Sequence, residues 1–245
     1  MKKPFLILQL RPEPEASDSE YEAILEKGGL TSGLARRIRL DREPVPTEPP
    51  LDGFAGVIVG GGPGCVSDPP EAKSPDEART EAAVMAMMPE ITGRDLPFLG
   101  CCYGIGILAR HLGGSVSKER YSEPVGPSVC SLTDEGRDDP LLSECPPKFS
   151  AFVGHKEAVQ SLPTGAVHLV RSEPCPYQMI RYGKNVYATQ FHPEADAAEI
   201  ELRIRIYRRH GYFPPEDADR LIDLCHAVDA PVPGSILRRF VEIYG

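Results

Sequence analysis

The sequence lacks the features that mark several classes of protein. No stretch approaches the roughly 20 consecutive apolar residues that a membrane-spanning helix needs. Basic residues are too few to favour a nucleic-acid or anionic-membrane partner, because 27 Lys and Arg stand against 36 Asp and Glu, a formal net charge of −9. The seven cysteines show no repeated C-x-x-C spacing, which indicates neither a disulfide framework nor a zinc site. We therefore expect a cytoplasmic protein that binds a small molecule and uses no metal or cofactor.

Strand-like and helix-like segments alternate through the first hundred residues. The first apolar run, 4–10, is too short for a signal peptide and ends in a charged Pro-rich segment, so we expect it to be a core strand. Further strand-like runs cover 35–40, 56–59 and 96–99, helical patterns cover 17–27 and 75–88, and a Pro-rich surface connection covers 43–51. This alternation predicts an α/β fold, a mostly parallel open sheet with helices on both faces and a ligand site at the carboxyl ends of its strands.

The second half of the chain is predicted to be mixed and then helical. Between 116 and 152, prolines, glycines and short apolar runs indicate a small antiparallel addition with loops. Three strand-like runs follow at 166–170, 177–182 and 186–191, and helical patterns cover 195–210, 214–227 and 235–244. We therefore expect one domain over residues 1–195 and a C-terminal helical extension over residues 196–245. The extension is predicted to pack on the same domain, and docking on another chain is the alternative.

Cys102 stands at an abrupt turn between a short apolar strand, 97–99, and a helical pattern. Glycines lie two positions away on each side, at Gly100 and Gly104, where side chains would collide with a strained central residue. Cys101 lacks this frame and is expected to pack inward from the strand. We predict that Cys102 is a nucleophile whose thiol pKa is lowered by the helix macrodipole. The alternative is an unreactive buried cysteine in a Gly-rich turn.

A histidine and a carboxylate late in the chain could serve such a nucleophile. His192 and Glu194 lie two residues apart at the end of a strand-like run that Pro193 terminates. Residues spaced this way in an extended chain point to the same side, so the carboxylate can reach one imidazole nitrogen and leave the other free to accept a proton. This arrangement is typical of acyl transfer. His155 is the rival base.

A glycine-rich turn at 60–64 follows another predicted strand. It lacks the Gly-Lys-Ser/Thr ending of a phosphate loop, and Pro63 is incompatible with a dinucleotide fingerprint. We interpret the turn as part of an oxyanion hole. The N–H groups of Gly62 and Tyr103 would donate to the developing oxyanion, because the second of them lies next to the nucleophile.

These motifs together carry a family resemblance. The segments 100–104, 61–64, 154–159 and 190–194 resemble those of class I (triad) glutamine amidotransferases, most closely the amidotransferase domain of GMP synthase. The resemblance implies a flavodoxin-like fold and attack by Cys102 on the side-chain amide of glutamine, forming a γ-glutamyl thioester and releasing ammonia. It implies that His192 moves protons and that Glu194 orients His192. It also implies a substrate pocket lined by Gly64, Gly106, Gly154, His155, Lys156 and Glu157.

The sequence departs from this family in two ways. Members commonly carry Gln where this chain has Gly106, and no loop for an ATP-dependent synthase is present. We therefore expect a separate synthase to accept the ammonia. One alternative is a stand-alone γ-glutamyl hydrolase that acts on γ-glutamyl peptides or amines. The other is a catalytically silent binding subunit.

Overall fold

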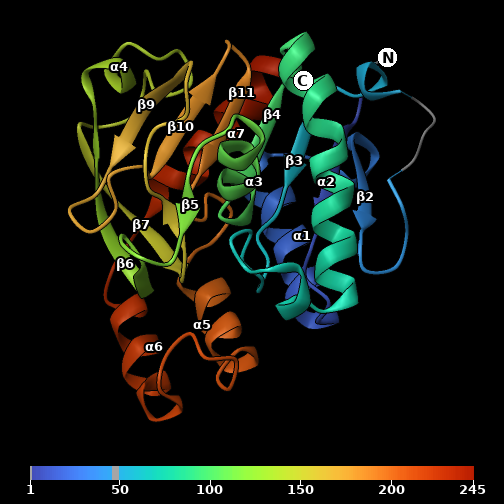
Figure 1. Ribbon diagram of the computed structural model, residues 1–245. Coiled ribbons are helices and arrows are strands. Elements are labelled where there is room, and N and C mark those ends of the chain that lie inside the picture. Colours follow the sequence, from blue (N-terminus) through green and yellow to red (C-terminus); the bar gives the residue numbers. More distant parts are fainter. Residues whose placement is uncertain (1, 46–49) are drawn as a thin grey trace.

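A computed structural model describes residues 2–45 and 50–245 (Figure 1). Within these residues the main sheet has nine strands, in the order β2-β1-β3-β4-β11-β10-β9-β6-β7. The parallel half consists of β2 (Ala35–Arg39), β1 (Phe5–Gln9), β3 (Val57–Val59), β4 (Phe98–Cys101) and β11 (Val186–Thr189). The antiparallel half consists of β10 (Met179–Tyr182), β9 (Ala166–Arg171), β6 (Glu123–Leu132) and β7 (Lys148–His155). A separate pair joins β5 (Val116–Ser117) to β8 (Ala158–Val159).

Helices cover both faces of this sheet, which confirms the predicted fold class (Figure 1). The helices are α1 (Pro14–Gly28), α2 (Pro75–Arg94), α3 (Tyr103–His111), α4 (Asp134–Arg137), α5 (Ala197–Ile206), α6 (Ala218–His226) and α7 (Pro231–Tyr244). The bounds differ from the predicted ones mainly at helix ends and at β11, which stops at Thr189 rather than residue 191. The predicted surface connection over 43–51 includes 46–49, which lie outside the described residues.

Local sequence signals explain where α2 begins. Ser74 caps the helix by accepting a hydrogen bond from the Glu77 N–H at 3.2 Å, and the Glu77 carboxylate accepts one from the Ser74 N–H at 2.8 Å. Pro75 follows at the first helical position, where its missing N–H costs no hydrogen bond. The helix nevertheless extends to Arg94, past the predicted residue 88, and includes Pro89. The packing of its buried side chains against the sheet stabilises the helix and offsets the destabilising effect of Pro89.

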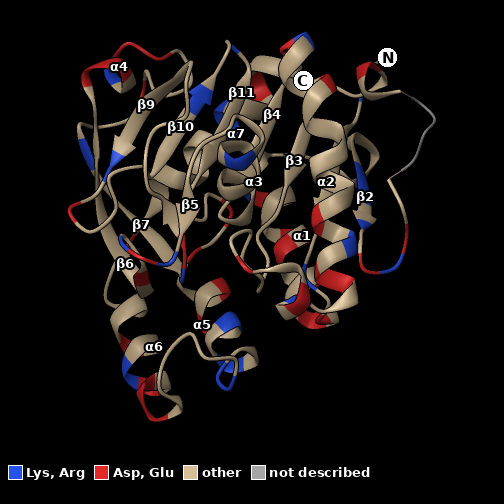
Figure 2. Cartoon of the chain, viewed as in Figure 1, with Lys and Arg blue, Asp and Glu red and all other residues tan. Residues whose placement is uncertain are grey.

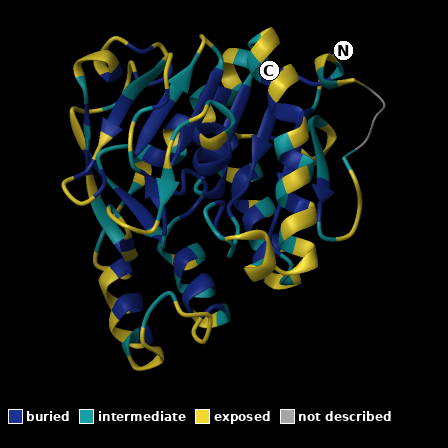
Figure 3. Ribbon diagram, in the orientation of Figure 1, coloured by how far each residue is buried: buried dark blue, intermediate teal, exposed yellow. Residues whose placement is uncertain are grey.

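The core lies on both faces of the parallel strands, which Figure 3 shows as the buried centre of the molecule. Alternate residues of β1 point to opposite faces: Phe5 and Ile7 pack in the layer that holds α1 and α7, and Leu6 and Leu8 in the layer that holds α2 and α3. A strand buried on both faces reads as a continuous apolar run. The first run of the sequence is therefore strand β1.

Helices α5 and α6 lie together beyond one end of the sheet (Figure 1). Their own apolar cluster includes Ile200, Ile204 and Leu221. Basic residues gather at the end of α5 and in the loop that follows, 203–209 (Figure 2). Helix α7 then returns to pack against α1. The division of the chain at residue 195 stays a prediction.

No helix in the described part of the chain is both long and apolar enough to cross a membrane.

Candidate active site

Cys102 occupies the sharp turn between β4 and α3. Its backbone has φ 51° and ψ −86°, a region that residues other than glycine rarely adopt and that costs about 1–3 kcal/mol. The Cys102 N–H donates to the Thr189 carbonyl of β11 at 2.7 Å, which holds the turn against the neighbouring strand. Strain of this kind, held by the surrounding structure, is what a nucleophile elbow uses to present its side chain.

The two glycines around this turn have different roles. A Cβ on Gly100 would lie 3.0 Å from the backbone of Gly104, so the strand and the helix approach each other too closely for any side chain at Gly100. A Cβ on Gly104 would meet nothing nearer than Val59 at 4.0 Å. The predicted reason, collision with the cysteine, is therefore wrong, because the constraint is the contact between Gly100 and Gly104.

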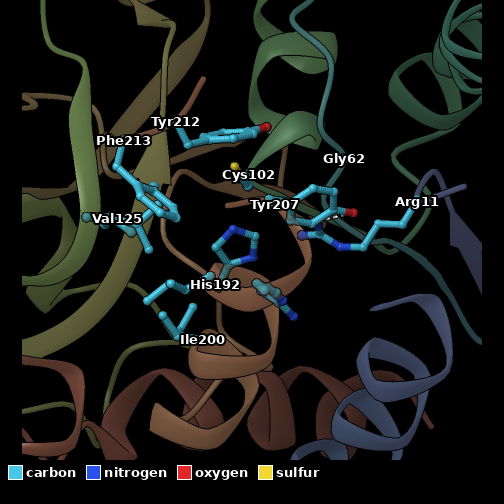
Figure 4. A pocket seen from close by; sticks show the side chains of 13 residues that line it. Arg11, Gly62, Cys102, Val125, His192, Ile200, Tyr207, Tyr212 and Phe213 are labelled. Carbon is cyan, nitrogen blue, oxygen red and sulfur yellow. Dashed lines mark hydrogen bonds between the residues drawn. The ribbon is translucent and has the colours of Figure 1, made fainter. Parts of the chain in front are cut away.

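The adjacent cysteines point to different environments. Cys101 is 1% exposed and belongs to the apolar core, whereas the sulfur of Cys102 faces a cavity (Figure 4). Burial raises the pKa of the Cys102 thiol to about 12, although the Arg11 guanidinium opposes this shift. The expectation of a lowered thiol pKa is therefore wrong, because desolvation of the thiolate outweighs nearby positive charge. The Cys102 thiol is therefore neutral near pH 7.

The neighbours of His192 fix the position, the tautomer and the charge of its imidazole. It lies in a turn three residues beyond the end of β11, not at the strand end, and its N–H donates to the Phe152 carbonyl at 3.0 Å. Its Nδ1 donates to Glu194 Oε1 at 2.8 Å, which leaves Nε2 as the basic nitrogen. Burial lowers the pKa of His192, so the imidazole is neutral near pH 7.

Glu194 is fully buried and is held by two partners. Its Oε1 accepts from His192 and from Arg203 Nη2, the latter at 2.9 Å. Burial opposes ionisation, but the charges of His192 and Arg203 and the hydrogen bond from His192 hold the pKa of Glu194 well below its usual value. The carboxylate is therefore ionised, and it orients the imidazole.

Cys102 and His192 line one cavity, together with Gly62 (Figure 4). In Figure 4 the His192 ring lies across this cavity from the sulfur of Cys102. The Gln190 side chain approaches the same sulfur, with Nε2 at 3.8 Å from Sγ. The structure thus brings the predicted nucleophile and the predicted base to one site, although about ninety residues separate them.

The candidate oxyanion donors lie beside the sulfur. Gly62 and Tyr103 line a second cavity that also contains Cys102. The Tyr103 N–H belongs to the first turn of α3, where backbone N–H groups have no acceptor within the helix. A Cβ on Gly62 would lie 3.3 Å from the Leu10 Cβ, so the loop packs closely on the segment that follows β1.

The six predicted substrate-binding residues all line this second cavity. They are Gly64, Gly106, Gly154, His155, Lys156 and Glu157. A Cβ on Gly106 would lie 3.0 Å from Val66 Cγ2 and 3.3 Å from Glu157 Oε1. The Glu157 carboxylate also accepts the N–H groups of Val66 and Ser67, at 2.7 and 2.8 Å. Val66 and Glu157 thus fill the space that a longer side chain at Gly106 would need.

His155 has both ring nitrogens engaged. Its Nε2 bonds Glu123 Oε2 at 3.0 Å and its Nδ1 bonds the Glu157 carbonyl at 2.8 Å. Glu123, His155 and Cys175 also bring three potential metal ligands within 4.8 Å of one another, a group that no sequence spacing indicated. Gln178 donates to the same Glu123 carboxylate, so this buried oxygen is already in use within the protein. Both ring nitrogens of His155 are thus engaged within the protein, whereas His192 keeps Nε2 as the basic nitrogen.

Five residues of the site were missed by sequence reasoning or noted without a role. Arg11, Arg203, Tyr207, Tyr212 and Phe213 all line the cavity of Cys102 and His192 (Figure 4). Arg11 pairs with the buried Glu20 at 2.8 Å, and its guanidinium lies over the Tyr207 ring at 5.6 Å. The basic character of α5 was visible in the sequence, but only the fold shows that Arg203 reaches Glu194.

Comparisons with known proteins agree with the fold and the motifs. A family model described as glutamine amidotransferase class-I matches residues 21–204. The chain is 30% identical over 236 residues to a GMP synthase (glutamine-hydrolyzing) of Aeropyrum pernix, covering 92% of this chain and 40% of that protein. It is 31% identical over 186 residues to the GMP synthase (glutamine-hydrolyzing) of Borrelia garinii, covering 72% of this chain and 32% of that protein. The chain therefore spans well under half the length of these relatives.

Solved structures share the fold over the whole chain. A glutamine amidotransferase from Thermotoga maritima superposes with a TM-score of 0.77 at 23% sequence identity, covering 100% of this chain and 99% of that one. A glutamine amidotransferase from Methylobacillus flagellatus superposes with a TM-score of 0.72 at 22% identity, covering 99% of this chain and 92% of that one. From the family match and the shared identity, the chain belongs to the class-I glutamine amidotransferase family.

Proposed function

We propose that this chain catalyses the glutaminase half-reaction of an amidotransferase. Cys102 Sγ attacks the side-chain amide carbon of glutamine while His192 Nε2 takes the thiol proton. The N–H groups of Gly62 and Tyr103 stabilise the oxyanion, and removal of one such donor costs about 10²–10³ in rate. His192 then protonates the leaving ammonia, and water hydrolyses the γ-glutamyl thioester.

The observation that carries this proposal is the meeting of Cys102 with the buried His192–Glu194–Arg203 chain at one cavity. The pKa of the thiol lies far above 7, and the pKa of the imidazole is lowered. The two groups therefore start as a neutral pair, and the thiol needs a base as it attacks. A neutral His192 whose Nδ1–H is held by a carboxylate supplies that base.

The ammonia acceptor is proposed to be a separate synthase. The two relatives named above are GMP synthases, and each is more than twice as long as the segment that matches this chain. By that similarity we propose that the released ammonia passes to a synthase.

A second candidate function is hydrolysis of other γ-glutamyl amides. The observation that favours it is Gly106. Family members commonly carry Gln at this position, but here Val66 and Glu157 fill the space that a Gln side chain would need. A recognition contact for free glutamine is thus replaced. A catalytically silent binding subunit is the third possibility.

The test is to incubate the purified chain with glutamine and to measure ammonia and glutamate. We expect both products in equal amounts, none from Cys102→Ala, and most of the activity from the matched control Cys101→Ala. A diazo-ketone analogue of glutamine should label Cys102. If all γ-glutamyl compounds gave neither turnover nor labelling, only the third possibility, a binding role without catalysis, would survive.

A further inference from the structure

Two cavities of different chemical character meet at Cys102. The second cavity, which holds the six predicted substrate-binding residues, has the charged side chains of Lys156 and Glu157 in its wall. The cavity that contains His192 has mainly apolar walls. Its apolar side chains are Val125, Val153, Ile200, Ile204 and Phe213, with the rings of Tyr207 and Tyr212 beside them. Gly62, Cys102, Gly154 and Tyr212 line both cavities.

The position of His192 decides which cavity receives the leaving group. Under the proposed function, on which this inference rests, His192 Nε2 donates a proton to the departing nitrogen. That nitrogen must therefore lie on the His192 side of the sulfur, while the glutamyl portion occupies the other cavity. We call the His192 cavity the leaving-group compartment.

The walls of this compartment suit a small apolar group. Val125 and Val153 lie on strands β6 and β7, and Ile200 and Ile204 lie on α5. These four lining side chains therefore belong to regular secondary structure. The compartment has a volume of about 40 Å³, space for roughly three atoms of the size of water. Ammonia as the leaving group would make no apolar contact with these side chains.

We propose that the leaving-group compartment binds the N-alkyl group of γ-glutamyl amides whose amine carries one to three carbons. Cys102 Sγ forms a bond to the amide carbon, the C–N bond breaks, and the thiol proton passes through His192 to the alkylamine. Water then hydrolyses the thioester to glutamate. Arg11 and Arg203 in the compartment wall disfavour an amine that carries a second positive charge.

Tyr212 lines both cavities. Its hydroxyl donates to the Pro63 carbonyl at 2.8 Å, and Lys156 Nζ lies 4.1 Å from the centre of its ring. Tyr212 lies in a loop, whereas the four apolar side chains Val125, Val153, Ile200 and Ile204 belong to β6, β7 and α5.

The test compares kcat/KM, from glutamate release, for glutamine and the γ-glutamyl amides of methylamine, ethylamine, propylamine and ethylenediamine. Each buried methylene should raise kcat/KM about fourfold, so the ethylamide should exceed the methylamide by that factor. The ethylenediamine amide, equal in length to the propylamide but cationic, should fall at least about tenfold below the propylamide. Ile204→Phe should lower the ratio of ethylamide to methylamide by filling the compartment. Arg205→Ala, an exposed position on the same helix, should leave that ratio unchanged.

The possible failures are distinguishable. Suppose that the chain hydrolyses glutamine but that kcat/KM for the alkylamides is at most about one tenth of the value for glutamine. This result would overturn the leaving-group compartment and leave the proposed function standing. The apolar walls would then serve only as a route for ammonia. A ratio that Ile204→Phe does not change would also overturn it. No hydrolysis of any substrate, with no labelling of Cys102, would overturn both proposals.

Discussion

Arg203 offers the sharpest test of how the site works, because it holds Glu194 by a hydrogen bond and its charge also lowers the pKa of the proposed base, His192. The Arg203 side chain is 8% exposed and Glu194 is fully buried, so Arg203→Met leaves a buried carboxylate with one cationic partner fewer. Removal of one member of a buried ion pair costs about 3–5 kcal/mol. For a chain of this length that corresponds to a fall in Tm of roughly 6–20 °C.

The activity of the same variant should change in a way that lost stability does not explain. Burial and the positive charge of Arg203 both lower the pKa of His192, so Arg203→Met should raise that pKa. The acidic limb of kcat/KM against pH should therefore move to higher pH, because His192 must be neutral to accept the thiol proton. Arg203→Lys should restore part of the wild-type profile, and Arg205→Met on the exposed face is the control.

The pH dependence of stability gives an independent reading of the same contact. The pKa of Glu194 is lowered in the folded state, so its contribution to stability is present above the unfolded value of 4.5 and is lost as the pH falls below it. Arg203→Met should reduce this acid-dependent loss. If its profiles of kcat/KM and of stability against pH superpose on those of the wild type, the coupling of Arg203 to Glu194 and His192 is refuted.

Three further predictions concern the elbow. Cys102→Gly should abolish turnover yet raise the free energy of unfolding by about 1 kcal/mol, since glycine adopts φ 51° without strain; a lower Tm would contradict this. Gly100→Ala should destabilise the chain by about 1–3 kcal/mol in urea unfolding, whereas Gly104→Ala should change stability far less, and equal effects would show that the close contact is misassigned. The rate of Cys102 alkylation by iodoacetamide, followed by peptide mass spectrometry, should keep rising from pH 7 to about 10, since its thiol pKa is about 12; a plateau near pH 7 would indicate a resting thiolate paired with His192.

Much of the fold and part of the site were predictable because their signals are local. The apolar runs of β1, β3 and β4 alternate with helical patterns, and this order alone implies a parallel sheet. The glycines around Cys102 mark an abrupt turn within five residues. His192 and Glu194 lie two positions apart, so their contact needs no knowledge of the rest of the chain.

Other features were not predictable because they depend on segments distant in the sequence. Arg11 follows β1 and Tyr212 follows α5, yet both line the cavity of Cys102. The raised pKa of the Cys102 thiol could not be inferred from its helix position, since desolvation depends on every segment packed around the sulfur.

The amino-acid order by itself predicted the alternating architecture, the presentation of Cys102 rather than Cys101 at the turn and the pairing of His192 with Glu194. Each of these rests on local sequence patterns, although the structure shows a Gly100–Gly104 contact and a turn at His192 where the sequence predicted a collision with the cysteine and a strand end. Only the tertiary structure decided the charge states of these groups, the contact of Arg203 with Glu194 and the apolar walls beside His192. Burial and long-range contacts are properties of the folded chain, because they arise when segments far apart in sequence exclude water from the same space.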